Sequence, residues 1–178
     1  MKYSVSSYSY MKMIRAGEIT PFEVIAKTKE LGFDAIEFVD FVDFLPLPEE
    51  ERPAYAEKIR AEADRLGLEI SSLTIGADFI NGCDGDFDKE VERVKKFVDL
   101  GRILGVKRMR HDATVGYPVN SGKYCAFDTL LPRLAEGCRL VTEYAEQFGI
   151  RTMIENHGFY AQDSERVEKL YSACLLYT

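Results

Sequence analysis

The stretch Glu146-Gln-Phe-Gly-Ile-Arg-Thr-Met-Ile154 ends an amphipathic helix with a glycine and then begins a short β-rich strand. The same cassette occurs three more times, and its four glycines are Gly32, Gly67, Gly105 and Gly149, spaced 35, 38 and 44 residues apart. Glycine is the residue that most readily takes the left-handed conformation that stops a helix and redirects the chain. The repeat therefore predicts parallel strands joined by helical crossovers.

The predicted strands differ in the loops at their two ends. Connections that follow a helix contain a glycine and one or two further residues, whereas three connections that follow a strand are long: residues 40–52, 76–85 and 111–127. Long loops gather at the face of an α/β barrel that carries the active site, and short loops gather at the opposite face. We therefore expect chemistry at the carboxyl ends of the strands.

The pattern of apolar residues gives the element boundaries. The capping box Thr20-Pro-Phe-Glu23 predicts a helix from Pro21 to Leu31. Asp163 and Ser164 are expected to cap the last helix. Five strands are predicted, over residues 3–8, 35–39, 70–75, 106–110 and 151–155.

Composition narrows the class of protein. The chain has 178 residues, 46% of them hydrophobic, and a net charge of −7 with a pI near 5.0. These values predict one globular domain and argue against a nucleic-acid partner. No apolar run is long enough for a membrane span, and the first residues are too polar for a signal peptide. The four cysteines lack paired spacing and are read as reduced thiols of a cytoplasmic protein.

Acidic and histidine residues gather at the predicted strand ends. Both histidines of the chain belong to this set, which comprises Glu37, Asp40, Asp78, His111, Asp112, Glu155, Asn156 and His157. Carboxylates and imidazoles that converge on one mouth suit a divalent cation. The strongest element is Glu155-Asn156-His157-Gly158, because it directly follows an apolar strand.

The same residues also admit structural roles. Glu155 could be a solvated strand end, His157 could cap a loop, and His111 with Asp112 could cap backbone groups. Glu37 could anchor neighbouring loops, whereas Asp40 and Asp78 are more typical of turns. The chain has no glycine-rich dinucleotide loop, no Walker loop and no nucleophile elbow, so those enzyme classes lack support.

The cassettes, the segment Gly32-Phe-Asp-Ala-Ile-Glu37-Phe, and above all Ile154-Glu-Asn-His-Gly-Phe-Tyr-Ala-Gln-Asp-Ser-Glu-Arg-Val167 resemble the xylose isomerase-like (β/α)8 barrel family. This family includes sugar phosphate isomerases and epimerases, inosose dehydratase and endonuclease IV. The resemblance implies an α/β fold, a partial TIM barrel over residues 1–173, with five parallel strands in the order 1-2-3-4-5 and helices on the outer face.

The resemblance also implies a function. A metal-dependent sugar isomerase or epimerase would bind Mn2+, Mg2+, Co2+ or Zn2+ and transfer a proton through an enediolate. Glu155 would be a metal ligand and, with His157, a catalytic residue. His111, Asp112, Glu37 and Asn156 would bind a small sugar or polyol substrate.

Other readings of the resemblance stay open. An inosose dehydratase-like lyase and a sugar-binding barrel without catalysis are the alternatives. Endonuclease IV-like cleavage is disfavoured, because it needs a basic groove and usually several histidines, whereas this chain has two histidines and a charge of −7.

The carboxyl end carries a separate expectation. The family's remaining ligands, an aspartate, a histidine and a glutamate, come from strands six to eight, which this chain lacks. We therefore expect an inactive five-eighths of a barrel from a parent that could be a homo-oligomer. Residues 174–178 are expected to be a non-native tail, similar to read-through of sequencing-adapter DNA.

Overall fold

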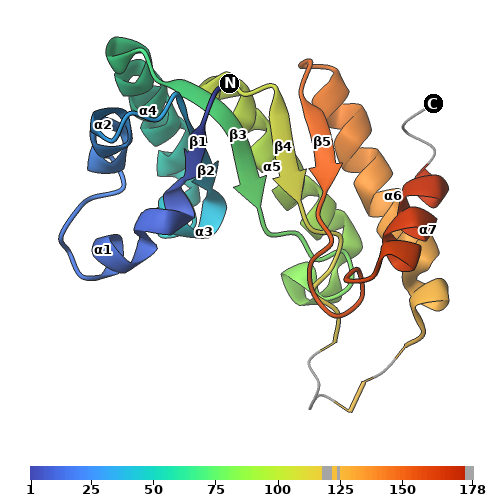
Figure 1. The fold of residues 1–178 in the computed structure, drawn as a ribbon. Helices are drawn as coiled ribbons and strands as arrows, with labels where there is room; N and C mark the ends of the chain where they lie inside the picture. Colours follow the sequence, from blue (N-terminus) through green and yellow to red (C-terminus); the bar gives the residue numbers. More distant parts are fainter. Residues whose placement is uncertain (118–121, 124, 175–178) are drawn as a thin grey trace. The chain divides into compact units, whose positions relative to one another are not determined.

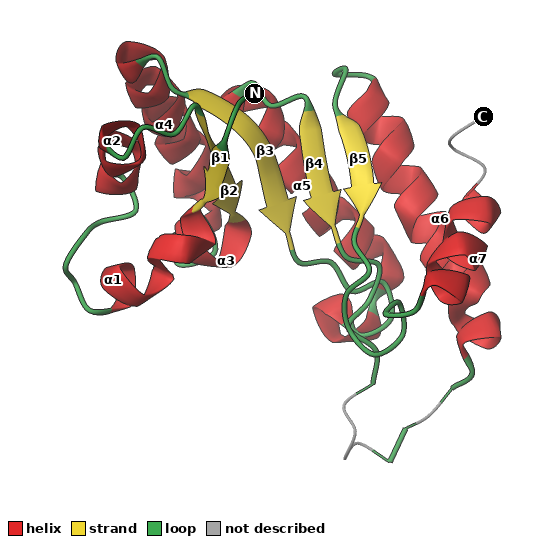
Figure 2. Ribbon diagram, in the orientation of Figure 1, coloured by secondary structure: helices red, strands yellow, loops and turns green. Residues whose placement is uncertain are grey.

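The computed structural model describes residues 1–117, 122–123 and 125–174. Five parallel strands form one sheet in the order β1-β2-β3-β4-β5, with helices around it (Figure 1). Figure 2 shows the strands as yellow arrows that point the same way. The predicted fold class and strand order are therefore confirmed. The strands are β1 (Ser4–Ser6), β2 (Ala35–Val39), β3 (Glu69–Ile75), β4 (Arg108–His111) and β5 (Arg151–Ile154).

The first predicted strand is shorter than expected. The chain leaves β1 after Ser6 and enters the 3-10 helix η1 (Ser7–Tyr10) and then α1 (Met11–Arg15). The cause is local, because the Ser6 side chain accepts a hydrogen bond from the backbone N–H of Tyr8 and thereby caps the 3-10 turn. Apolar and polar residues alternate only weakly in this segment, so the sequence pattern did not predict where the strand ends.

The chain divides into two compact units, and the first comprises residues 1–75 and 99–109. Its helices include α2 (Glu23–Glu30) and α4 (Arg52–Leu66), with the short α3 (Asp40–Asp43) and η2 (Glu49–Glu51) inside a predicted loop. The capping box is confirmed, because Thr20 and Glu23 exchange backbone and side-chain hydrogen bonds of 2.7–3.2 Å. β1 pairs with β2, and β2 with β3, in parallel register.

The second unit comprises residues 76–98 and the chain from residue 110 onward. It contains η3 (Gly82–Gly85), α6 (Phe127–Glu146) and α7 (Ser164–Cys174), whereas α5 (Phe87–Leu104) contributes residues to both units. The predicted apolar stripe of α6 is buried at Leu134, Cys138, Val141 and Ala145. Asp163 caps α7 by accepting a hydrogen bond from the backbone N–H of Arg166 at 2.9 Å.

The four cassette glycines have the predicted conformation. Their φ angles are 84° at Gly32, 61° at Gly67, 74° at Gly105 and 65° at Gly149, all left-handed. Each therefore ends a helix just before a strand of the sheet, as the repeat indicated.

Three further expectations concern membrane spans, the cysteines and the tail at the carboxyl end. No helix in the described part of the chain is long and apolar enough to cross a membrane. All four cysteines are free thiols. Cys174 is the last residue of α7 and is buried, whereas residues 175–178 of the expected tail lie outside the described residues.

Candidate metal centre

Three predicted site residues of the second unit converge at the carboxyl ends of β4 and β5. Asp112, Glu155 and His157 each offer a ligand atom, and these atoms lie within 4.8 Å of one another. Asp112 is buried, Glu155 is half-buried and His157 is exposed. Glu155 and His157 come from the loop that follows β5, and Asp112 directly follows β4, so the parallel pairing of these strands brings the group together.

The backbone explains why these side chains meet. The N–H of Glu155 donates to the carbonyl of His111 at 3.2 Å, which holds the end of β5 against the end of β4. The N–H of His157 donates to the carbonyl of Glu155 at 3.0 Å and closes a tight turn. Gly158 follows with φ 72°, and a Cβ there would lie 3.0 Å from the Cα of Val115. A side chain at position 158 would therefore push the two loops apart.

Both carboxylates of the group already have protein partners. Nδ1 of His157 lies 3.1 Å from Oδ1 of Asp112, a distance that fits an N–H donated to the carboxylate. The guanidinium of Arg110, on β4, forms an ion pair with Oε2 of Glu155. Arg110 and Glu155 are partly exposed, with side-chain exposures of 28% and 38%. A hydrogen bond to Asp112 and an ion pair to Glu155 therefore hold the group in place.

His111 directly precedes Asp112 and is completely buried. Its Nδ1–H donates to the backbone carbonyl of Asp112 at 2.8 Å, and its ring meets the ring of Phe79 edge-on at 6.2 Å. Burial lowers the pKa of His111, so the ring is neutral near pH 7. Its Nε2 has no hydrogen-bond partner among the described residues. This geometry orients the backbone at Asp112.

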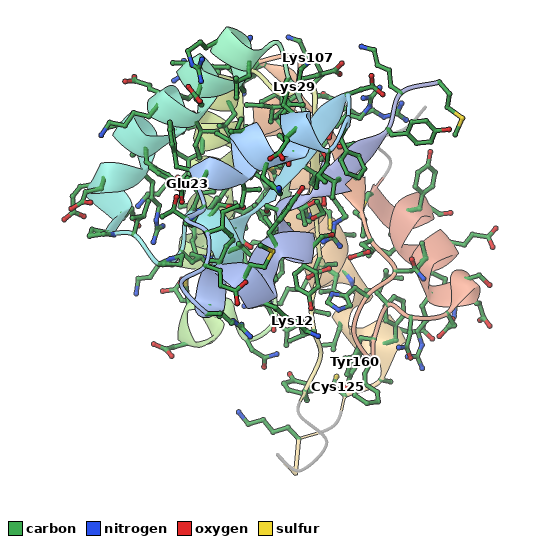
Figure 3. All side chains as sticks on the ribbon, turned by 60° about the vertical axis from the view of Figure 1, so that its left-hand side comes forward. Lys12, Glu23, Lys29, Lys107, Cys125 and Tyr160 are labelled. Atoms are coloured by element: carbon green, nitrogen blue, oxygen red, sulfur yellow. The ribbon has the colours of Figure 1, made fainter. Side chains whose placement is uncertain are left out.

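The loops that follow β4 and β5 are clasped together by Tyr160. Its hydroxyl donates to the carbonyl of Cys125 at 2.8 Å, and Figure 3 shows the two labelled residues beside each other. The tyrosine ring covers Gly116, where a Cβ would lie only 2.1 Å from the ring. Residue 116 must therefore be glycine for Tyr160 to pack there, and this packing supports the loop that carries Asp112.

The other predicted site residues do not belong to this group of three. Glu37 belongs to the first unit, where it accepts a hydrogen bond from Ser72 Oγ at 3.1 Å. Asn156 is exposed and contributes no ligand atom to the group. Asp78 behaves as a turn residue, because its Oδ1 accepts hydrogen bonds from the N–H groups of Ile80 and Asn81. The roles assigned to Glu37 and Asn156 stay predictions.

Arg110 is the residue that sequence reasoning missed. It ends the predicted fourth strand, one residue before the His111-Asp112 pair. The sequence signal that could have identified Arg110 is a positively charged residue at the end of a strand that leads into an acidic residue. The partner, Glu155, is 45 residues away, so only the pairing of β4 with β5 identifies it.

Two cavities of the structure lie elsewhere. One, of about 390 Å3, is lined by residues at the start of β5, including Gly149, Ile150 and Arg151. Another, of about 360 Å3, is lined by residues at the starts of β3 and β4, including Glu69 and Arg108. Both lie at the amino ends of strands, where α/β barrels carry stabilising rather than catalytic residues. The convergent ligands therefore identify the candidate site better than cavity size does.

The donor set fits a divalent cation. Carboxylate oxygens and a neutral imidazole nitrogen are ligands of Zn2+, Mn2+ and Co2+. An Nδ1–H donated by His157 to Asp112 leaves the Nε2 lone pair for a ligand bond, an arrangement typical of metal-binding histidines. Three protein ligands leave positions open for water or substrate, as catalytic sites require.

The chain belongs to the xylose isomerase-like TIM barrel family, whose family model matches residues 25–174. Among solved structures, the IOLI protein with a bound zinc atom matches with a TM-score of 0.71 and 14% identity, covering 98% of this chain and 59% of that protein. D-psicose 3-epimerase in the presence of D-fructose matches with a TM-score of 0.69 and 20% identity, covering 96% and 60%. The probable 3-DHS dehydratase AsbF of Bacillus anthracis matches with a TM-score of 0.70 and 15% identity, covering 98% and 59%.

These comparisons establish the family and the fold. The identities lie below 25%, so the solved structures inform the fold alone. The chain spans about three-fifths of the length of these three proteins. No curated protein matches the sequence.

Proposed function

We propose that this chain carries part of the active site of a metal-dependent enzyme that isomerises or epimerises a sugar or sugar phosphate. The observation that carries the proposal is the convergence of Asp112, Glu155 and His157 within 4.8 Å at the ends of β4 and β5. Family membership and the similarity to D-psicose 3-epimerase and to zinc-bound IOLI support it. The substrate class and the metal belong to the proposal.

Each residue receives a role that its surroundings favour. Glu155 and His157 hold the cation and face the substrate, because both are at least partly exposed. Asp112 is buried and orients His157 or adds a third ligand oxygen. His111 is a positioning residue, because it is buried and holds the carbonyl of Asp112.

The chemistry needs a base and a site for negative charge. Glu155 and His157 would hold a divalent cation, which would supply positive charge to stabilise the anion formed when a carbon-bound proton is removed. Glu155 is the proposed acid–base group, since a carboxylate can accept that proton and return it. His157 orients a substrate hydroxyl through its exposed ring.

The test needs a longer protein, because the proposed activity is that of the whole enzyme. This chain would be joined to the carboxyl-terminal part of D-psicose 3-epimerase, and exchange of the substrate's carbon-bound hydrogen with deuterated water would be followed by NMR. We expect exchange that stops with a chelator and in Glu155→Gln. Exchange that survives both chelator and Glu155→Ala would contradict the proposal.

The same experiment separates the alternative of dehydration. Isomerisation and epimerisation conserve the molecular formula of the substrate. A dehydratase instead releases one water molecule, so its product has a correspondingly lower mass. The probable 3-DHS dehydratase among the structural matches makes this control necessary. Mass spectrometry of the product decides between the two reactions.

A further inference from the structure

We propose that the Arg110 guanidinium neutralises Glu155 in place of a metal ion. A divalent cation and Arg110 would therefore compete for the Glu155 carboxylate. This inference rests on the proposed function, because it concerns the same site. It adds a residue, Arg110, that sets how tightly and how selectively the site takes up a divalent ion. The observation behind it is the ion pair between the Arg110 guanidinium and Oε2 of Glu155.

The contact concerns a ligand carboxylate rather than a surface acid. Glu155 belongs to the three-residue group, and its backbone N–H is bonded to the carbonyl of His111, the neighbour of Arg110 in β4. Strand pairing therefore places Arg110 and Glu155 at one point of the sheet edge. The hydrogen bond from the Glu155 N–H to the His111 carbonyl fixes the backbone of Glu155 beside β4 and so keeps the two charged side chains close to each other.

The charges around the group explain why such a cation is useful. Asp112 and Glu155 bring two negative charges within 4.8 Å, and Asp112 is only 6% exposed. Like charges at this distance repel each other, and burial strengthens the repulsion. Arg110 offsets this repulsion in the metal-free chain. A divalent ion does the same with two charges, and Arg110 then has no carboxylate left to neutralise.

Competition has a measurable consequence. A metal must displace the guanidinium from Glu155, so breaking the ion pair reduces the apparent affinity for the metal. A partly exposed pair contributes on the order of 1 kcal/mol, which corresponds to about fivefold in the dissociation constant. Removing the guanidinium should therefore tighten metal binding by about this factor.

The matched control lies on the same strand. Arg108 is exposed and stands two residues before Arg110, at the start of β4. Arg108→Gln removes the same charge from the strand but leaves the Arg110–Glu155 pair intact. General repulsion of the metal by positive charge would change with either substitution, whereas competition for Glu155 changes only with Arg110→Gln.

The experiment is a titration of the chain with Mn2+ by isothermal calorimetry, up to millimolar concentrations. We expect Arg110→Gln to bind Mn2+ about fivefold more tightly than the unaltered chain. Arg110→Lys should lie between them, because lysine keeps the charge but lacks the planar guanidinium and its fixed set of donors. Arg108→Gln should match the unaltered chain. Circular dichroism confirms that each variant is folded, and the lysine variant serves if the glutamine variant is not.

A double substitution tests the route of the effect. In a Glu155→Gln background, Arg110→Gln should no longer tighten binding, because there is no carboxylate to compete for. Equal affinities of the unaltered chain and Arg110→Gln would overturn the inference but leave the proposed function intact. An equal gain with and without Glu155 would also overturn it. Absence of Mn2+ binding in every variant would overturn the inference as well, whereas the proposed function is decided separately by the deuterium-exchange test on the longer protein.

Discussion

Replacing Asp43 by asparagine should stabilise the chain above neutral pH, because Asp43 is a carboxylate buried with few partners. Its side chain is 2% exposed, and Oδ2 accepts hydrogen bonds from Ser7 Oγ at 2.5 Å and from the N–H of Val39 at 2.9 Å. Oδ1 has no hydrogen-bond partner within the described ranges. Burial, the largest influence, raises the pKa of Asp43 from 3.8 to about 7, although both hydrogen bonds act to lower it.

The sign of the effect follows from where the proton is bound. Between the two pKa values the folded chain holds a proton on Asp43 that the unfolded chain has lost, so stability falls as the pH rises. The loss is complete above pH 7 and absent below the unfolded value of 3.8. At about 1.4 kcal/mol per pH unit, the full difference corresponds to about 4 kcal/mol.

Asparagine keeps a carbonyl oxygen for the two donors and carries no charge. The Asp43→Asn variant should therefore lack this pH dependence and exceed the unaltered chain in free energy of unfolding by up to about 4 kcal/mol near pH 8. Below the unfolded value of 3.8, where Asp43 is protonated in both the folded and the unfolded chain, the two proteins should be close. Urea unfolding followed by circular dichroism at several pH values measures the difference.

The matched control is Asp64→Asn, which removes an exposed carboxylate from the same unit. Asp64 is paired with Arg60 at the surface, and such a pair contributes little at any pH. Its profile should run parallel to that of the unaltered chain. If the Asp43→Asn profile is also parallel, Asp43 is ionised in the folded chain and the reasoning from burial is wrong.

Three further predictions concern packing and local structure. Gly137→Ala should destabilise the chain by about 1–3 kcal/mol, because the new Cβ would lie 2.5 Å from the ring of Phe79. This cost should exceed the gain from alanine's higher helix propensity. Thermal unfolding measures the effect, and a raised melting temperature would contradict the prediction. Thr20→Ala should cost about 1 kcal/mol by removing the capping box with Glu23, as measured by urea unfolding, and an unchanged midpoint would show that the cap is dispensable. The Cys138 thiol should resist iodoacetamide until the chain is unfolded, because its pKa is raised by its neighbour Cys174 and by burial; mass spectrometry of labelled peptides would reveal any early reaction.

The fold was predictable because its determinants are local and repeated. Each cassette combines an amphipathic helix, a left-handed glycine and a strand, and each signal lies within about ten residues of the others. The end of β1 was not predictable from this pattern, because a serine cap and the burial of Ser7 against Asp43 decide it. Asp43 belongs to a segment expected to be a loop, so its burial depends on contacts that the sequence pattern does not reveal.

The candidate site was predictable in part for the same reason. Asp112 and Glu155 directly follow a strand and His157 comes three residues after one, so the cassette pattern places them at one sheet edge. The structure groups the ligand atoms of all three residues within 4.8 Å of one another. Asp112 is therefore a candidate metal ligand, whereas the sequence predicted only a role in substrate binding. The burial of His111 follows from packing against Phe79, which is 32 residues away.

Arg110 shows what a strand-end rule leaves out. The rule selects acids and histidines because they bind metals, and it passes over cations because they do not. Yet two carboxylates that are brought together by strand pairing need positive charge nearby, and Arg110, on β4, supplies it to Glu155. An arginine one residue before such a group is therefore the residue to test first, since its removal changes metal affinity while every proposed ligand remains in place.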